Sequence, residues 1–153
     1  MTDFEIRSLA AGDLEAAERI HRDAFGSEAW DRKAIGEVMA MPRSAGLIAL
    51  DREGRAIGFA LYLLVAQDAE LLTIAVPHDA RRKGIGRALV ESFLAIAALA
   101  GATTALLEVA EDNPIAQTLY HRLGFKVSGH RKDYYRRPGN RRVGARLLNR
   151  PIP

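Results

Sequence analysis

The run from Leu71 to Gly101 constrains the fold of this chain more than any other stretch. Its first segment, Leu71–Val76, is mostly apolar and stops at Pro77, which is typical of a short buried strand. Two glycines, Gly84 and Gly86, follow at the point where a helix should begin. Apolar residues then recur at helical spacing up to Gly101, which predicts a long helix. The run therefore predicts a strand, a glycine-containing turn and a helix in immediate succession.

The turn between this strand and this helix has the composition of a phosphate site. A helix N-terminus offers unpaired N–H groups and the positive end of the helix dipole. Glycines allow a ligand to approach the backbone closely, and basic residues crowd the same point. We therefore expect a pyrophosphate group to bind here, on Arg81, Arg82, Lys83, Gly84, Ile85, Gly86 and Arg87. An ordinary helix start with a solvated basic cap is the alternative interpretation.

Two common phosphate-binding motifs do not fit this turn. The dinucleotide pattern G-x-G-x-x-G fails because Leu89 stands at the third glycine position, and the chain contains no Gly-Lys-Ser/Thr sequence. The pattern present is R-x-x-G-x-G, from Arg81 to Gly86, and it resembles the acetyl-coenzyme A signature of the GNAT superfamily of N-acetyltransferases. This resemblance implies that acetyl-CoA is a co-substrate.

Length and composition set limits on the class of protein. The 153 residues, of which 48% are hydrophobic, predict a single domain with a real core, spanning 1–153. The absence of cysteine excludes disulfides, thiolate metal sites and a cysteine nucleophile, and it fits a cytoplasmic location. There is neither a long apolar run nor a secretory-type start, so no membrane contact is expected. The four histidines show no ligand spacing, so no metal is expected.

Charge is distributed unevenly along the chain. The segment 130–153 carries eight of the 22 lysines and arginines but only one of the 19 acidic residues. A basic tail on an acidic body favours a negatively charged partner, and RNA near the substrate is one such partner. A solvated basic face without any partner is the alternative.

The remaining periodicity predicts a mixed α/β domain of about seven strands and about four helices. Strands are expected at 4–9, 45–50, 56–65, 67–76, 103–109 and 125–127, helices at 14–25, 30–41, 85–100 and 113–123, and a closing basic hairpin, within 130–153, with arms at 133–137 and 146–148. The strand that follows the long helix should lie parallel to the strand before it. His21 falls on the apolar stripe of its helix and is expected to be a packed core residue, whereas Trp30 could pack or line a cleft.

This order of elements resembles the GNAT fold, a single domain whose mixed central sheet splays around acetyl-CoA. The two separating strands would be 71–76 and 104–109. Backbone N–H groups at the end of the first strand, on Ile74, Ala75 and Val76, are well placed to polarise a thioester carbonyl if that strand parts from its neighbour. The resemblance implies that these residues also hold the pantetheine arm.

A second block, Leu106–Phe125, resembles RimI-type enzymes, which acetylate the N-terminal amine of a ribosomal protein. The match includes L-E-V at 107–109 and L-Y-x-x-L-G-F at 119–125. It implies that Glu108 is the general base, Tyr120 the proton donor to the leaving thiolate, and Asn113 a ligand of the coenzyme arm. The alternatives are a strand-end surface carboxylate, a packed helix aromatic and a helix N-cap. For Tyr120, a hydrogen bond to the sulfur without proton transfer also stays open.

The acceptor is the part of this resemblance with the weakest sequence support. Tyr134 and Tyr135 resemble a tyrosine pair that closes over the substrate N-terminus, but arginines replace an acidic pair that the family usually carries in its tail. An α-amino group, with a pKa near 8, loses its proton more easily than a lysine, with a pKa near 10.4. This difference favours an N-terminal acceptor.

The expected function is therefore direct transfer of an acetyl group from acetyl-CoA to a protein N-terminal α-amine, such as the N-terminal alanine of a ribosomal protein. Two alternatives stay open at this point. One is a GNAT enzyme that acetylates a small-molecule amine or a protein lysine. The other is a coenzyme-binding, RNA-associated module that binds without turnover.

Overall fold

The computed structural model describes residues 3–153 and contains one mixed sheet with helices on both faces. The elements are β1 (Phe4–Ser8), α1 (Leu14–Phe25), α2 (Arg32–Met39), β2 (Ser44–Asp51), β3 (Ala56–Val65), β4 (Asp68–Ala75), α3 (Ile85–Leu99), β5 (Thr104–Ala110), α4 (Pro114–Arg122), β6 (Lys126–Arg137) and β7 (Arg141–Pro151). The sheet order is β1-β2-β3-β4-β5-β7-β6. The predicted α/β class, the sheet of seven strands and the four helices are confirmed for the described residues.

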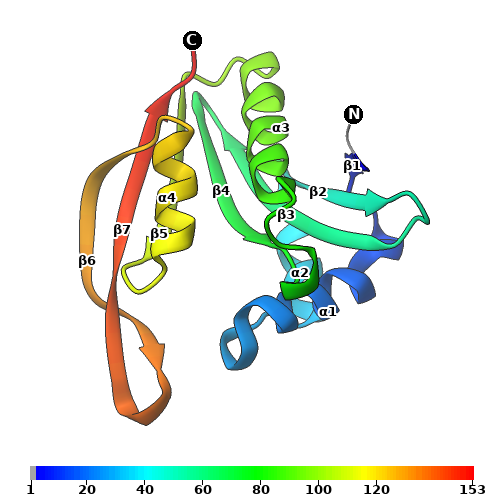
Figure 1. Ribbon diagram of the computed structural model, residues 1–153. Coiled ribbons are helices and arrows are strands. Elements are labelled where there is room, and N and C mark those ends of the chain that lie inside the picture. Colours follow the sequence, from blue (N-terminus) through cyan, green and yellow to red (C-terminus); the bar gives the residue numbers. More distant parts are fainter. Residues whose placement is uncertain (1–2) are drawn as a thin grey trace.

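The pairing of β4 with β5 is parallel, while the other neighbouring strands of the described sheet run antiparallel. The long helix α3 connects these two strands, as the strand–turn–helix reading predicts. Figure 1 shows β4 and β5 side by side at one end and diverging toward the other, so that the sheet opens like a V. This opening divides the sheet into a β1–β4 half and a β5–β7 half.

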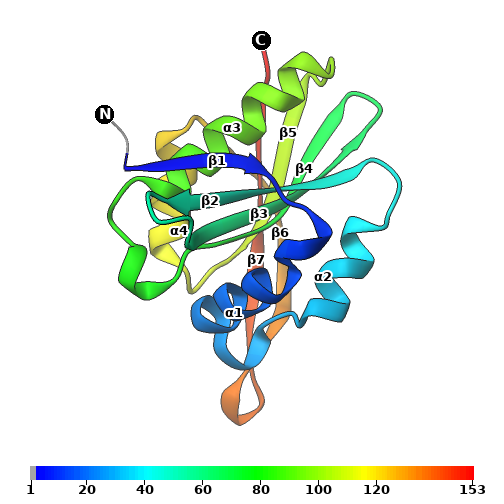
Figure 2. The same ribbon diagram turned by 90° about the vertical axis from the view of Figure 1, so that its right-hand side faces the viewer.

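Two apolar clusters hold the helices on the sheet. Helices α3 and α4 cover one face through a cluster that includes Leu89, Phe93 and Phe125, and α1 and α2 cover the other through one that includes Ile35 and Phe59. Figure 2 shows the two pairs of helices on opposite sides of the strands. Burial of large apolar side chains on both faces is the main favourable contribution to folding.

The start of α3 lies unusually close to the sheet. A Cβ built on Gly58 of β3 would lie 2.9 Å from Cγ2 of Ile85 and 3.3 Å from Cδ1 of Leu89. Real Cβ atoms essentially never lie within 3.0 Å of another heavy atom, so a larger residue at this position would force the Ile85 side chain to shift.

The closing hairpin is longer than predicted. The sequence indicates arms at 133–137 and 146–148, whereas β6 and β7 run continuously over Lys126–Arg137 and Arg141–Pro151. The register of β6 shifts between Val127 and Gly129 and again between Arg131 and Tyr135. Such bulges break the alternation of apolar and polar residues on which strand prediction depends. The many charged residues of this edge strand make the alternation still harder to recognise. The predicted turn at Pro138–Asn140 is confirmed.

Smaller differences occur at other ends. The second helix begins at Arg32 rather than Trp30, because Oδ1 of Asp31 accepts a hydrogen bond from the N–H of Ala34 at 2.9 Å and caps the helix. Within residues 3–153, the helices are all too short or too polar to cross a lipid bilayer.

Candidate active site

The opening between β4 and β5 contains a cavity of about 640 Å³. The two strands pair only from Asp68 to Leu71 on β4 and from Thr104 to Leu107 on β5. On its other side, β4 pairs with β3 through a register shift, in which Leu72 is an extra residue opposite Leu61 and Tyr62. A bulge bends its strand and re-aims the side chains that follow. Beyond Leu71, the edge of β4 that faces β5 has no strand partner, so its backbone polar groups face the cavity.

The cavity brings together both residues that the sequence assigns to catalysis, Glu108 and Tyr120, and some of those that it assigns to binding. Its wall is formed by β4, β5, α1, α4 and the end of β6, and includes Thr73, Ile74, Glu108, Asn113, Tyr120 and Tyr135. Of the other predicted residues, Ala75 is buried at 3% exposure and Val76 packs against the α3 cluster. The predicted strands and helices therefore converge on one site.

Glu108 projects into this cavity from β5 and forms an ion pair. Nε of Arg131, on the adjoining hairpin, lies 3.1 Å from Oε1 of Glu108, whose side chain is one-quarter exposed. A second carboxylate lies near: the pKa of Glu70 on β4 is raised, first by burial and second by the negative charge of Glu108. Glu70 is not part of the cavity wall. Three carboxylates, on Glu28, Glu108 and Asp112, line the cavity, and Asp112 is paired with Arg137 at 2.8 Å.

Tyr120 enters the cavity from α4. The residue is 5% exposed and its ring packs edge-to-face against Phe125, with centroids 5.8 Å apart. Burial raises the pKa of the Tyr120 phenol, and Tyr135 raises it further. The phenol therefore stays protonated at neutral pH. No hydrogen bond joins its hydroxyl to another residue of the described chain, so this O–H is available to a ligand.

Asn113 caps α4 at the mouth of the cavity. Its Oδ1 accepts a hydrogen bond from the N–H of Ala116 at 3.1 Å, as the N-cap interpretation predicts. The side-chain amide N–H groups are not engaged by this cap, so capping and ligand binding are compatible. Gln117, which sequence reasoning missed, donates from Nε2 to the carbonyls of Ala110, Glu111 and Asn113 at 3.0–3.2 Å. This network fixes the loop that positions Asn113.

In the predicted phosphate turn, backbone N–H groups lack helical partners, whereas two of the arginine side chains contact the protein itself. The first helical hydrogen bond runs from the N–H of Ala88 to the carbonyl of Gly84, at 3.0 Å. The N–H groups just before it therefore lack helical acceptors. Nε of Arg81 donates to the carbonyl of Val76 at 3.1 Å, and Arg87 pairs with Glu91 at 3.4 Å. These two cations stabilise the turn and the helix instead.

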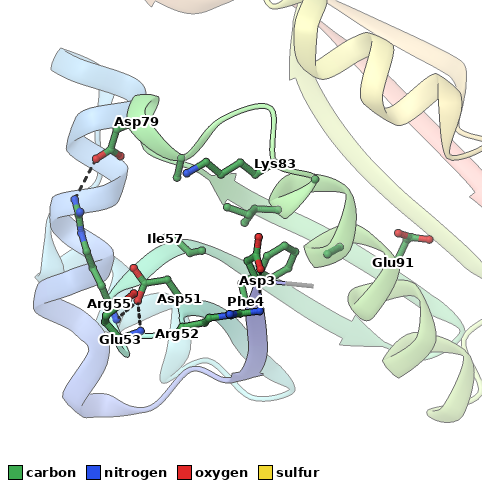
Figure 3. Close-up of a pocket in the computed structure, with 14 residues that line it drawn as sticks. Asp3, Phe4, Asp51, Arg52, Glu53, Arg55, Ile57, Asp79, Lys83 and Glu91 are labelled. Carbon is green, nitrogen blue, oxygen red and sulfur yellow. Dashed lines mark hydrogen bonds and ion pairs between the residues drawn. The ribbon is translucent and has the colours of Figure 1, made fainter. Parts of the chain in front are cut away.

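A second cavity, of about 760 Å³, lies on the β2–β3 side of the same turn. Figure 3 shows Lys83 extending over it and Arg55 paired with Asp79, at 3.2 Å. The wall contains five carboxylates, on Asp3, Asp51, Glu53, Asp79 and Glu91, against three cations. Lys83, Gly84 and Ile85 of the predicted phosphate turn line this second cavity and not the one between β4 and β5. Glu108 and Tyr120 both line the cavity between β4 and β5, which is therefore the candidate active site.

The two predicted substrate tyrosines differ in position. Tyr135 lines the cavity and is half-buried, and its pKa is raised, mainly by burial and next by the charge of Glu108. Tyr134 lies outside the cavity wall, 47% exposed, with its ring edge-on to that of Tyr135 at 5.0 Å. Arg137, which lies 5.5 Å from the centroid of the Tyr135 ring, is held by Asp112 through two hydrogen bonds of 2.8 Å. Only Tyr135 is placed to contact a ligand directly.

His21 is a packed core residue, as predicted, but it also borders the cavity. It is 2% exposed and lies between the rings of Phe25 and Trp30, with centroid distances of 4.3 and 5.2 Å. Its Nδ1 accepts a hydrogen bond from the backbone N–H of Trp30, and its Nε2 lies 3.0 Å from Oγ1 of Thr73. Burial lowers the pKa of His21 from 6.5 to about 4.

This shift makes the stability of the protein depend on pH. Unfolded chains bind a proton at His21 below about pH 6.5, whereas the folded protein does so only near pH 4. The His21 contribution is thus complete above pH 6.5 and is lost as the pH falls toward 4, by roughly 3 kcal/mol in all. Urea unfolding of the wild type and of His21→Gln between pH 7 and pH 4 measures it. Parallel stability curves for the two proteins would contradict the assignment.

The described residues contain no group of three or more histidine and acidic side chains placed to hold a metal ion. The described structure thus combines a mixed sheet that opens beside a helix N-terminus with a carboxylate and a phenol that line the opening. The chain belongs to the acetyltransferase (GNAT) family, whose model matches residues 14–125.

Individual relatives agree with this assignment. The chain is 35% identical over 130 residues to the [ribosomal protein bS18]-alanine N-acetyltransferase of Escherichia coli, covering 85% of this chain and 86% of the relative. The crystal structure of the ribosomal-protein-S18-alanine N-acetyltransferase from Escherichia coli superimposes with a TM-score of 0.90 and 32% identity, covering 97% of this chain and 94% of that one. Arabidopsis thaliana NAA60 in complex with acetyl-CoA shares the fold, with a TM-score of 0.84, 20% identity and coverage of 97% and 98%. The predicted GNAT family and RimI-type resemblance are confirmed.

Proposed function

We propose that this acetyltransferase moves the acetyl group of acetyl-CoA to the N-terminal α-amine of a protein, and that the acceptor is the N-terminal alanine of a ribosomal protein of the S18 type. The observation that carries this proposal is the similarity, over most of both chains, to an enzyme named for that reaction. A ribosomal-protein acceptor is met in the cytoplasm, which agrees with the absence of cysteine.

The donor would be held mainly by backbone. The N–H groups of Gly84, Ile85, Gly86 and Arg87 lie at the N-terminus of α3, where the helix dipole favours the negative charge of a pyrophosphate. Arg82 adds a positive side chain beside them. The unpaired edge of β4 at Ile74–Val76 offers hydrogen bonds to the pantetheine arm and the thioester oxygen. The amide N–H groups of Asn113 reach the arm from the opposite wall.

Glu108 would act as the general base. The incoming ammonium must lose a proton before its nitrogen attacks the thioester carbon, and Glu108 accepts that proton through a water molecule. The backbone N–H groups of β4 stabilise the negative charge that develops on the carbonyl oxygen. When the carbon–sulfur bond breaks, the nitrogen releases its second proton to solvent and keeps the acetyl group as an amide, and the sulfur departs as a thiolate.

Tyr120 would act on that thiolate. A phenol has an ordinary pKa of about 10 and a thiol one of about 8.5, so full proton transfer costs about 2 kcal/mol before burial is counted. Burial raises the pKa of Tyr120 further and makes the transfer less favourable still. We therefore assign Tyr120 as a hydrogen-bond donor that stabilises the departing sulfur. The thiolate then takes its proton from water rather than from Tyr120.

A panel of acceptors tests this function. We expect release of free CoA from acetyl-CoA with an alanine-starting S18-type peptide, and none with the same peptide after its N-terminus is blocked. Turnover of the blocked peptide through a lysine, or of spermidine, would move the protein to another acceptor class. Binding of acetyl-CoA without turnover of any acceptor would indicate a coenzyme-binding module instead.

The basic hairpin supports a second proposal, a contact with RNA near the acceptor. Figure 1 shows the β6–β7 hairpin projecting beyond the rest of the sheet. Near its tip, Arg136 lies directly opposite Arg142 in the register, and both are exposed. Like charges directly opposite each other destabilise a strand pair. A polyanion would relieve this repulsion, and the exposed ring of Tyr134 beside them suits stacking on a base.

Removing this arginine pair should weaken RNA binding in a salt-dependent way. We expect Arg136→Gln/Arg142→Gln to reduce the slope of log affinity against log salt concentration by about 1 to 2. Fluorescence anisotropy with a labelled single-stranded RNA measures the slope. The control, Arg19→Gln/Lys33→Gln, removes two exposed charges from α1 and α2 instead. An equal decrease of the salt slope in both variants would show that only the net charge of the protein matters, and it would contradict the proposal.

A further inference from the structure

The hydrogen bonds of His21 determine which of its ring nitrogens carries the proton. The backbone N–H of Trp30 can only donate, so Nδ1 of His21 must accept and is unprotonated. A neutral imidazole then carries its proton on Nε2. Since Nε2 lies 3.0 Å from Oγ1 of Thr73, the histidine donates and the threonine oxygen accepts. The hydroxyl proton of Thr73 must therefore point elsewhere.

The position of Thr73 directs this proton toward the cavity. Because Leu72 is the bulged residue of β4, Thr73 pairs with Leu61 and faces α1, whereas Leu71 belongs to the cluster beneath α3. Thr73 is half-buried and lines the cavity. Its hydroxyl hydrogen-bonds with no described residue other than His21. A hydroxyl with an engaged oxygen and a free proton is an oriented donor for a ligand.

Two faces of the sheet thus contribute different groups to the cavity. Leu107 and Val109 belong to the cluster beneath α3 and α4, so by alternation Glu108 faces the α1 side together with Thr73. Tyr120 enters from α4, on the opposite side. If the sulfur of acetyl-CoA lies near Tyr120, the α1 side of the cavity, next to Glu108, remains open to the acceptor amine.

We propose that Thr73, oriented by His21, donates a hydrogen bond to the first carbonyl oxygen of the acceptor peptide. The inference rests on the proposed N-terminal acetylation and identifies the feature by which the site would distinguish a peptide from a simple amine. In a peptide, that carbonyl lies one carbon from the reacting nitrogen. Beside Thr73, Phe25 and Trp30 stack on His21 and form an apolar wall suited to the small side chain of alanine. Thr73 is thus a specificity-determining residue and His21 a positioning residue.

The test pairs two variants with two acceptors. Thr73→Val removes the hydroxyl at nearly constant shape, and Thr73→Ser retains it. The acceptors are an alanine-starting peptide and its analogue in which a methylene replaces the first carbonyl. We expect Thr73→Val to raise KM for the normal peptide by about 3- to 10-fold, with little change for the reduced analogue. We expect Thr73→Ser to restore KM and the Kd for acetyl-CoA to stay unchanged in both variants.

Each other outcome is decisive. Equal losses of Thr73→Val on the two acceptors would reduce the hydroxyl to a structural role and overturn the inference, since a double-mutant cycle isolates the contact. A fall in kcat of Thr73→Val with both acceptors would indicate that the hydroxyl donates to the thioester oxygen instead, and this result would also overturn the inference. If the wild type acetylates neither peptide, the proposed function fails and this hydrogen bond with it. If the wild type acetylates the normal peptide and the valine variant matches it, only this inference fails.

Discussion

Glu108→Gln should lower kcat/KM by about 10²- to 10⁴-fold, the range typical of a lost general base. The glutamine amide cannot accept the proton of the acceptor ammonium. The variant must therefore use the small fraction of acceptor that is already deprotonated in solution. Glutamine retains an oxygen for the 3.1 Å contact with Arg131, and the side chain is one-quarter exposed, so the fold should be conserved. Initial rates of CoA release, with thermal unfolding measured in parallel, check both expectations.

The matched control for this prediction is Glu70→Gln. Glu70 lies near enough for the charge of Glu108 to raise its pKa, yet it is not part of the cavity wall. We expect its activity to stay within a few-fold of the wild type. A large loss with Glu70→Gln and a small one with Glu108→Gln would reverse the assignment of the base. Rescue of Glu108→Gln at high pH, where the amine is already deprotonated, would support the assignment.

Tyr120→Phe should lower kcat by about 10- to 100-fold while the affinity for acetyl-CoA changes little. The variant removes only the hydroxyl and keeps the ring that packs against Phe125 at 5.8 Å. A lost hydrogen bond to a charged group costs about 1.5–3 kcal/mol, and the thiolate carries its charge only as the bond breaks. The effect should therefore fall on kcat rather than on binding. Steady-state kinetics and calorimetric titration with acetyl-CoA separate the two.

Tyr62→Phe is the control for the loss of a buried phenol. Tyr62 is 6% exposed, packs against Phe93 at 5.6 Å and has a pKa raised by burial, but it lies outside the cavity wall. We expect this variant to retain near wild-type kcat. Normal turnover by Tyr120→Phe would show that the hydroxyl has no part in expelling the thiolate and that Tyr120 is only a packing residue.

Local patterns were sufficient to predict the central part of the fold. The strand that ends at Pro77, the glycines at 84 and 86 and the apolar spacing of α3 are short-range features, and each agrees with the element observed. The joint resemblance of these residues, Glu108 and Tyr120 to GNAT motifs also indicated the family.

Features that depend on long-range register escaped sequence reasoning. His21 and Thr73 are 52 positions apart, and they meet only because the bulge at Leu72 turns Thr73 toward α1. Gln117 gives no sequence signal, since its three acceptors are backbone carbonyls of the preceding loop. The crowd of cations near Gly84 was equally ambiguous, because composition does not tell whether an arginine contacts a ligand or its own chain, as Arg81 does.

The most direct test of the proposed function is to locate the acetyl group on a peptide that offers both kinds of amine. The substrate is an alanine-starting S18-type peptide with a free N-terminus and an internal lysine, incubated with acetyl-CoA and the wild-type protein. Fragmentation mass spectrometry then assigns the added 42 Da, the mass of an acetyl group less a hydrogen, to one end of the peptide. We predict a single acetyl group on the N-terminal alanine and an unmodified lysine. Acetylation of the lysine with a free N-terminus would contradict the account.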